Sequence, residues 1–162
     1  VALNAKANGV RVAFTDENLL DAPAPDVEVI CAGDIFYEKP VAARAHAPKR
    51  VVLISSGAGV VGNHGWGAYA LSKAALNMLA QLYAHELPAT QLLALAPGLI
   101  DTDMQSALRE VDIMRFPALK RLHAAHGSAD MPDADTVAAR IEAAMPRLSA
   151  LASGSFIDLR KL

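Results

Sequence analysis

Short apolar runs alternate with longer stretches of helical character along this chain. Five runs are typical of strands: residues 10–14 (VRVAF), 27–32 (VEVICA), 50–55 (RVVLIS), 91–96 (QLLALA) and 155–159 (SFIDL). The run at 50–55 is apolar almost without interruption, which is typical of a strand that is covered on both faces of a sheet. The alternation predicts an α/β fold, with a mostly parallel sheet of about five strands, flanking helices and right-handed crossovers.

Helices are predicted over residues 1–8, 69–87, 102–108, 117–126 and 133–145. The long Ala- and Leu-rich helix is expected to end at Pro88, and the last helix is expected to begin at Asp133 and to stop at Pro146. Helices on both faces of one sheet give a three-layer sandwich, and no repeat or Gly/Ser/Pro-rich linker divides the chain. We therefore expect a single domain over residues 1–162.

Composition narrows the range of functions. The 162 residues are 53% hydrophobic and 20% charged, with a formal net charge of −2, which predicts a folded core. No Lys/Arg run is present, which argues against nucleic acid and against an anionic membrane surface as partners. No apolar run reaches the ~20 residues of a membrane span. The single cysteine, Cys31, excludes an internal disulfide and fits the reducing cytoplasm.

Candidate chemistry follows the third apolar run, because the carboxyl ends of parallel strands hold the sites of such sheets. Ser56 follows that run, and Tyr69 and Lys73 stand four residues apart near the start of the long predicted helix, on one face. A nearby ammonium favours the ionised form of a phenol, and a serine hydroxyl can hold a substrate oxygen. This predicts proton transfer to a carbonyl oxygen. For the Tyr-Lys pair alone, an exposed first helical turn is the alternative.

The wider pattern resembles the short-chain dehydrogenase/reductase family over roughly residues 50–160. The matching stretches are VVLISSGAGVVGNHGWGAYALSKAALNMLAQLYAHEL, then LLALAPGLIDTDM, then SGSFIDL. The Gly-Trp-Gly-x-Tyr and Asp-Thr-Asp-Met-Gln motifs resemble the sepiapterin reductase and benzil reductase branch. The resemblance implies a Rossmann-like sheet and an NAD(P)-dependent carbonyl reductase or alcohol dehydrogenase that acts on a small-molecule carbonyl substrate.

The resemblance assigns a role to each matching polar residue. Ser56 would orient the carbonyl, Tyr69 would donate the proton, and Lys73 would assist the tyrosine and hold the nicotinamide ribose of NADP or NAD. The other cofactor-binding candidates are Gly33, which stands where the family has Asn-Asn-Ala-Gly, and Pro97, Gly98 and Thr102. Trp66 and Met104 would face the substrate, with packing as the alternative for each. No metal is implied.

A glycine pattern at residues 57–62 (GAGVVG) matches G-x-G-x-x-G after a strand, which is the pattern of a dinucleotide-binding turn. The following residues, NHGWG, are poor helix formers, and no acidic residue stands about 20 positions later. We therefore predict a flexible active-site loop here. The family's own Gly-rich turn and first strand are not found before residue 50.

Residues 1–48 resemble another family, the class I S-adenosylmethionine-dependent methyltransferases that modify protein lysines. The similar stretches are LNAKANGV, TDENLLD and DVEVICAGDIFYEKPVAARA. This suggests a chimera, with a methyltransferase-like segment at 1–48 and a reductase-like segment at 49–162. The alternatives to a reductase are a methyltransferase with S-adenosylmethionine, and a non-catalytic or engineered chimeric scaffold.

An apolar stripe on the long predicted helix bears on assembly. Ala75, Met78, Leu79 and Leu82 share one face of that helix. Burial against the sheet explains the stripe, and a partner helix in a homo-oligomer is the alternative.

Overall fold

The computed structural model describes residues 29–32 and 50–162. In these residues the sheet has four strands: β1 (Val29–Ala32), β2 (Arg50–Ile54), β3 (Gln91–Ala96) and β4 (Ser155–Asp158). They lie in the order β1-β2-β3-β4, and every neighbouring pair is parallel. The predictions at 27–32, 50–55, 91–96 and 155–159 are therefore confirmed, with shifts of one or two residues at the ends. The strand predicted at 10–14 lies outside the described residues.

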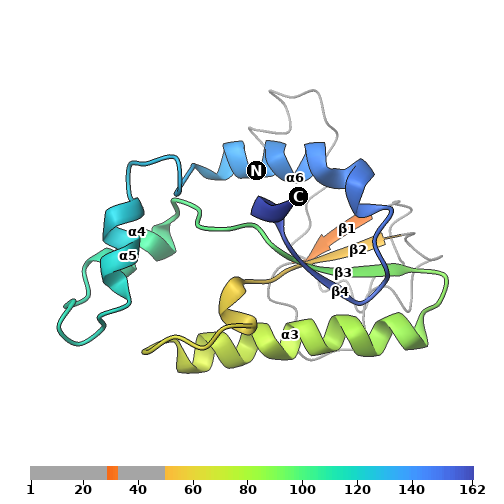
Figure 1. The fold of residues 1–162 in the computed structure, drawn as a ribbon, viewed down its shortest axis with the longest axis horizontal. Helices are drawn as coiled ribbons and strands as arrows, with labels where there is room; N and C mark the ends of the chain where they lie inside the picture. Colours follow the sequence, from red (N-terminus) through yellow and green to blue (C-terminus); the bar gives the residue numbers. More distant parts are fainter. Residues whose placement is uncertain (1–28, 33–49) are drawn as a thin grey trace, which may run out of the picture.

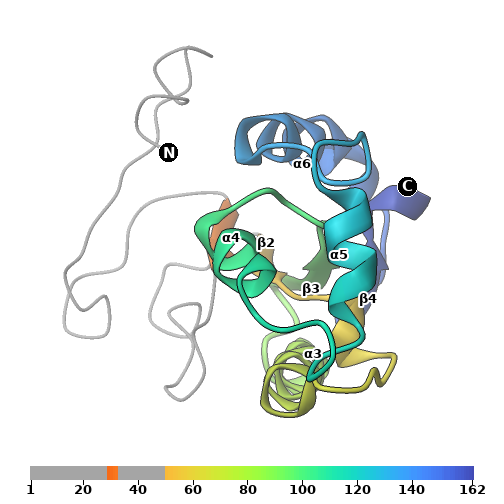
Figure 2. The same ribbon diagram turned by 90° about the vertical axis from the view of Figure 1, so that its left-hand side faces the viewer.

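Within the described residues, four helices accompany the sheet (Figure 1). They are α3 (Gly67–Glu86), α4 (Asp103–Arg109), α5 (Leu119–Ala125) and α6 (Ala134–Leu148). Two short 3₁₀ turns, η1 (Gly57–Gly59) and η2 (Leu159–Lys161), follow β2 and β4. Helix α3 covers one face of the sheet and α6 the other, while α4 and α5 stand beyond the carboxyl end of the strands (Figure 2). The predicted three-layer α/β sandwich is confirmed.

Alternate side chains of the central strands build two separate cores. Val51 and Leu53 of β2 pack with Leu76 and Ala80 of α3. The residue between them, Val52, is fully buried on the opposite face, in the core that includes Leu148 of α6. A strand buried on both faces needs apolar residues at consecutive positions, which is why the 50–55 run has no polar alternation.

The two helical crossovers lie on opposite faces of the sheet. The β2-α3-β3 and β3-α6-β4 connections both step in the same direction across the parallel sheet, but α3 and α6 cover different faces. Their hands are therefore opposite, and the expectation that both are right-handed is wrong. The reason is the route after β3, which passes through α4 and α5 beyond the sheet and so reaches the second face before α6 begins.

Helix α6 begins as predicted but does not end as predicted. The Asp133 carboxylate accepts a hydrogen bond of 2.6 Å from the Thr136 backbone N–H, which caps the helix. Pro146 lies inside the last turn, and the helix continues to Leu148. The fully buried Leu148 packs in the core beneath α6, and that burial favours the extra turn despite the missing N–H of the proline.

The face that α3 turns to the sheet differs from the predicted stripe. Leu76 and Ala80 are completely buried, while Met78 and Leu82 are more than half exposed. Only Leu79 of the predicted stripe packs against the sheet core. The helix is apolar on more than one face, so periodicity alone did not identify the buried side. The homo-oligomer stays a prediction. None of the described helices is both long enough and apolar enough to cross a membrane.

Candidate functional site

Two serines follow β2 and face different surroundings. Ser55 is buried, and its hydroxyl donates a 2.5 Å hydrogen bond to Oδ1 of Asn77 on α3. Ser56 is half-buried and begins the η1 turn, where its hydroxyl oxygen accepts from the Ala58 N–H at 3.2 Å. Because that hydroxyl accepts, its proton remains able to donate to a substrate oxygen.

The η1 turn packs directly against the helix that carries Tyr69. A Cβ placed on Gly59 would lie 2.7 Å from the backbone carbonyl carbon of Lys73 and 2.9 Å from the Ala74 nitrogen. Nδ2 of Asn77 also donates to the Gly59 carbonyl at 3.4 Å. A side chain larger than that of glycine would push the turn away from α3. The close approach therefore holds the Ser56 turn on the helix.

Lys73 joins α3 to the carboxyl end of β2. Its side chain is buried, and Nζ donates a hydrogen bond of 3.1 Å to the Ile54 carbonyl oxygen. The same Nζ lies 5.8 Å from the centre of the Tyr69 ring, within the range of a cation–π contact. A positive charge is thus held beside the phenol, at the edge of the sheet where Ser56 follows β2.

An aromatic cluster adjoins the phenol. The Trp66 ring centroid lies 5.4 Å from that of Tyr69 and 5.0 Å from that of Phe116, which meets it edge-on. Gly65, at φ +87°, lies so close to the Phe116 ring that an added Cβ would overlap it. Trp66 and Phe116 also pack on the small core under α5. Trp66 therefore packs in the loop and borders Tyr69, and its predicted role of facing the substrate stays a prediction.

The Pro97-Gly98 turn ends β3 as predicted. Gly98 has φ +97°, and a Cβ there would meet Cδ of Arg160 at 3.3 Å. Arg160 in turn donates from Nε and Nη2 to the two carboxylate oxygens of Asp158, at 2.8 and 2.6 Å. This hydrogen bonding and the positive charge lower the pKa of Asp158 and raise that of Arg160.

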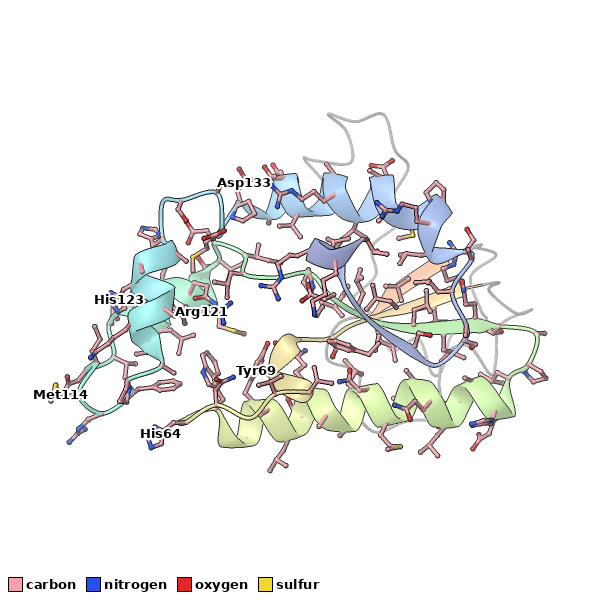
Figure 3. All side chains as sticks on the ribbon, in the orientation of Figure 1. His64, Tyr69, Met114, Arg121, His123 and Asp133 are labelled. Atoms are coloured by element: carbon pink, nitrogen blue, oxygen red, sulfur yellow. The ribbon has the colours of Figure 1, made fainter. Side chains whose placement is uncertain are left out.

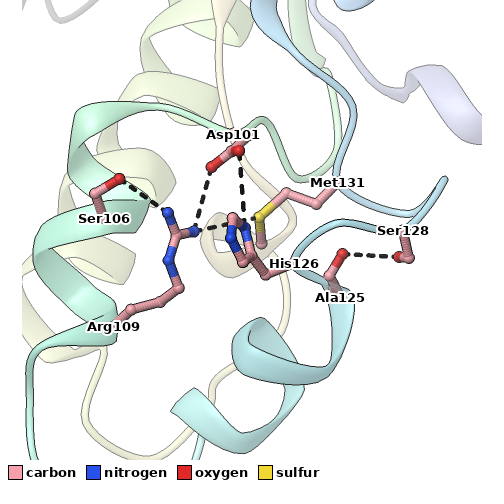
Figure 4. A network of polar contacts seen from close by, with 7 residues as sticks. All are labelled: Asp101, Ser106, Arg109, Ala125, His126, Ser128 and Met131. Atoms are coloured by element: carbon pink, nitrogen blue, oxygen red, sulfur yellow. Dashed lines mark hydrogen bonds and ion pairs between the residues drawn. The ribbon is translucent and has the colours of Figure 1, made fainter.

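Asp101 organises the segment after this turn (Figure 4). Its Oδ1 lies 3.2 Å from Nη1 of Arg109 on α4, and its Oδ2 lies 3.7 Å from Nδ1 of His126 after α5. Its backbone N–H also donates to the Pro132 carbonyl, at 2.9 Å. Asp101 thereby connects the end of α4, the residue after α5 and the approach to α6.

The structure brings some of the predicted site residues together and leaves others apart. Tyr69 and Lys73 lie together, and Ser56 begins a turn that contacts their helix; Figure 3 shows Tyr69 near the start of α3, at the α5 end of the molecule. Thr102 and Met104 lie at the start of α4, both exposed, and Thr102 makes no side-chain cap. Gly33 lies outside the described residues, as does nearly all of the methyltransferase-like segment. No metal-binding cluster of His, Cys, Asp or Glu occurs in the described part of the chain.

The sequence did not reveal the contacts by which two residues, Asn77 and Phe116, position this site. Asn77 lies four residues after Lys73 and bonds both the strand end and the η1 turn. The sequence signal for Asn77 was its place one helical turn after Lys73, as a polar residue on a face of α3 that is buried in the structure. The contact of Phe116 with Trp66 was not predicted, because it joins positions far apart in the sequence.

The fold and site define a class: a parallel α/β sheet in which a helix carrying a tyrosine beside a lysine packs against the serine-led turn that follows a central strand. Residues 42–112 match the sequence model of the short chain dehydrogenase family. The chain is 45% identical over 83 residues to a benzil reductase of Bacillus cereus, and 36% identical over 111 residues to the sepiapterin reductase of Rattus norvegicus. From about residue 50 onward, the chain belongs to the short-chain dehydrogenase/reductase family.

Solved structures agree on the fold. The KRED1-Pglu enzyme superposes with a TM-score of 0.60 at 32% identity, over 68% of this chain and 48% of that one. The aligned regions cover 44% of this chain and 33% of the benzil reductase, and 68% of this chain and 41% of the sepiapterin reductase. The chain thus spans less than half the length of these relatives.

Proposed function

We propose that this chain reduces a ketone carbonyl with a hydride from a nicotinamide dinucleotide, and that Ser56, Tyr69 and Lys73 carry the proton chemistry. The supporting observation is the placement of Lys73, whose buried ammonium is bonded to the end of β2 while it lies over the Tyr69 ring. A cation beside a phenol favours the phenolate that remains once the proton has been given away.

The described residues include the types of hydrogen-bond donor that such a cofactor needs. The ammonium of Lys73 and the hydroxyl of Ser56 are donors of the type that ribose and carbonyl oxygens accept, and both lie at the carboxyl edge of the sheet, where this fold binds nucleotides. The Pro97-Gly98 turn ends the neighbouring strand at the same edge. When bound, the reduced nicotinamide supplies the hydride that becomes attached to the carbonyl carbon.

Residues of this chain hold and protonate the carbonyl oxygen of the substrate. Ser56 donates a hydrogen bond to the carbonyl oxygen and holds it toward Tyr69. As the carbon–oxygen π bond breaks, its electron pair takes the phenolic proton of Tyr69, so that an alcohol and a phenolate result. The Lys73 ammonium balances the negative charge of that phenolate, and the resulting electrostatic stabilisation lowers the barrier.

An aromatic ketone or diketone is the proposed substrate class. Trp66 borders Tyr69 and rests on Phe116, which places aromatic surface next to the reacting phenol. The relative with 45% identity is named as a reductase of benzil, a diketone with two phenyl groups. Met104 is 56% exposed near the start of α4 and is proposed to contact the substrate from that side. The cytoplasm, where NADPH is available, is the proposed location.

A reduction assay tests this function. The full chain is incubated with benzil and either NADPH or NADH, and the loss of reduced nicotinamide and the benzoin formed are measured together. We expect benzoin to form in step with cofactor oxidation, with NADPH preferred. In parallel, thermal unfolding is followed with NADPH and with S-adenosylmethionine. Saturable stabilisation by S-adenosylmethionine alone, without benzoin formation, would favour the methyltransferase, and a response to neither ligand would favour a non-catalytic scaffold.

A further inference from the structure

A cavity of about 480 Å³ opens at the carboxyl end of β3. Its walls come from the Pro97-Gly98 turn, α5, the loop that precedes α6, α6 itself and η2. Apolar residues make up most of the lining: Pro97, Leu99, Ala124, Ala125, Ala129 and Pro132. This volume lies within the ~300–1,000 Å³ that is common for small-molecule sites.

The charged lining is predominantly basic. Arg121, Arg140 and Arg160 reach the cavity from three different elements, and Asp130 is the one acidic residue of the lining. This concentration stands out in a chain whose formal net charge is −2. All three arginines are exposed, so their attraction for an anion is screened by salt and depends on the ionic strength.

Arg160 is held in place by its neighbours. Asp158 accepts two hydrogen bonds from the guanidinium group of Arg160, and the stem of Arg160 runs so near Gly98 that a Cβ added there would meet Cδ at 3.3 Å. The carboxylate balances most of the charge of Arg160. Arg160 therefore shapes this wall of the cavity more than it attracts a ligand.

Arg121 and Arg140 differ from Arg160 in having no such partner. Neither makes a hydrogen bond or an ion pair with another described residue. Arg121 shares one face of α5 with the cavity-lining Ala124 and Ala125, because these stand three and four residues later on the helix. Two guanidinium groups from α5 and α6 thus line one cavity, and neither forms an ion pair with Asp130, the acidic residue of the lining. Guanidinium groups bind carboxylate and phosphate oxygens in a paired, planar geometry.

We propose that this cavity binds the oxyanion group, phosphate or carboxylate, of a small molecule through Arg121 and Arg140, with the apolar walls contacting the remainder of that molecule. The lining does not include Ser56, Tyr69 or Lys73, but its Pro97-Gly98 wall is shared with the proposed cofactor site. The oxyanion proposal itself does not depend on the reductase proposal. An uncharged molecule of the same shape would leave both guanidinium groups without a partner.

Binding to the full chain is measured by calorimetry at constant ionic strength, with inorganic phosphate, phenyl phosphate, benzoate and benzyl alcohol as probes. We expect saturable binding of the anions, tighter binding of phenyl phosphate than of phosphate because of the apolar walls, and no binding of benzyl alcohol. The relative affinities of phenyl phosphate and benzoate show whether the cavity prefers a phosphate or a carboxylate.

Matched variants locate the binding. Arg121→Gln and Arg140→Gln are each expected to weaken phenyl phosphate binding by about tenfold or more, the loss typical of one charged hydrogen-bonding partner. Lys120→Gln on α5 and Arg147→Gln on α6 remove exposed cations that do not line the cavity, and they are expected to leave the affinity within about twofold. Circular dichroism verifies that each variant is folded.

Three results would overturn the proposal. The first is an absence of saturable anion binding, and the second is an equal loss of affinity in all four variants, which would indicate only general charge attraction. The third is one-for-one displacement of phenyl phosphate by NADPH, which would assign the cavity to the dinucleotide. None of these measurements involves carbonyl reduction, so they fail or succeed independently of the proposed activity.

Discussion

The Lys73 ammonium donates a 3.1 Å hydrogen bond to the carbonyl oxygen of Ile54, the last residue of β2. The lysine is only 7% exposed, and a buried ammonium needs such partners because burial removes it from water. The bond fixes the charge where strand and helix meet, beside the Tyr69 ring.

Replacing Lys73 with Met is expected to reduce the kcat for benzil by about 100-fold or more, since the phenolate would lose its counter-charge. The Ile54 carbonyl would also lose its partner, so the free energy of unfolding in urea should fall by about 1–3 kcal/mol. Lys120→Met, at an exposed position on α5, is the matched control and should change neither quantity appreciably. Full activity in Lys73→Met would remove the lysine from the proposed chemistry.

Gly59→Ala is expected to destabilise the fold by about 1–3 kcal/mol, because its Cβ would be forced against the backbone of Lys73 and Ala74. Gly57→Ala is the control, since a Cβ at that position meets nothing within 4 Å. The two variants are compared by urea denaturation. Equal stability of the two would show that η1 does not pack on α3 as described.

Asp133→Ala is expected to lower the melting temperature, because the Thr136 N–H loses its capping oxygen. Asp133→Ser keeps an oxygen at the cap and should recover most of the loss. Thermal unfolding of the three proteins compares them. If the serine variant is no more stable than the alanine variant, the cap is not the source of the effect.

Asp158 is expected to contribute to acid sensitivity. Its hydrogen bonds from Arg160 lower its pKa in the folded state, so the stabilisation is present above the ordinary carboxyl pKa of about 3.9 and is lost as the pH falls through the lower folded value. The stability difference between wild type and Asp158→Asn should therefore shrink from about pH 6 to about pH 2. A constant difference across that range would contradict this assignment. Asp103→Asn, at an exposed carboxylate without an ion pair among the described residues, is the control.

Local signals were sufficient for much of the fold. The 50–55 and 91–96 runs gave β2 and β3 nearly to the residue, because continuous apolar residues between turn formers leave few alternatives. Asp133 indicated the start of α6 through its capping chemistry. Their helical spacing predicted that Tyr69 and Lys73 share one face of a helix. The surrounding motif indicated the family.

Features that depend on distant contacts were not predictable in the same way. Pro146 stays inside α6 because Leu148 is buried beneath it, which no local pattern reveals. The buried face of α3 was misplaced because Met78 and Leu82 are as apolar as the residues that pack on the sheet. The cavity around Arg121 and Arg140 joins elements that are separated in sequence, so only the structure brings those residues together.

Comparison of Tyr69→Phe with Tyr83→Phe tests the proposed chemistry most directly. Both tyrosines lie on α3, but Tyr83 packs against the sheet core. Each variant loses one phenolic hydroxyl, and the kcat for NADPH-dependent benzil reduction is measured in both. We predict a loss of about 100-fold or more for Tyr69→Phe and little change for Tyr83→Phe. Wild-type turnover in folded Tyr69→Phe would contradict the assignment of Tyr69 as the proton donor.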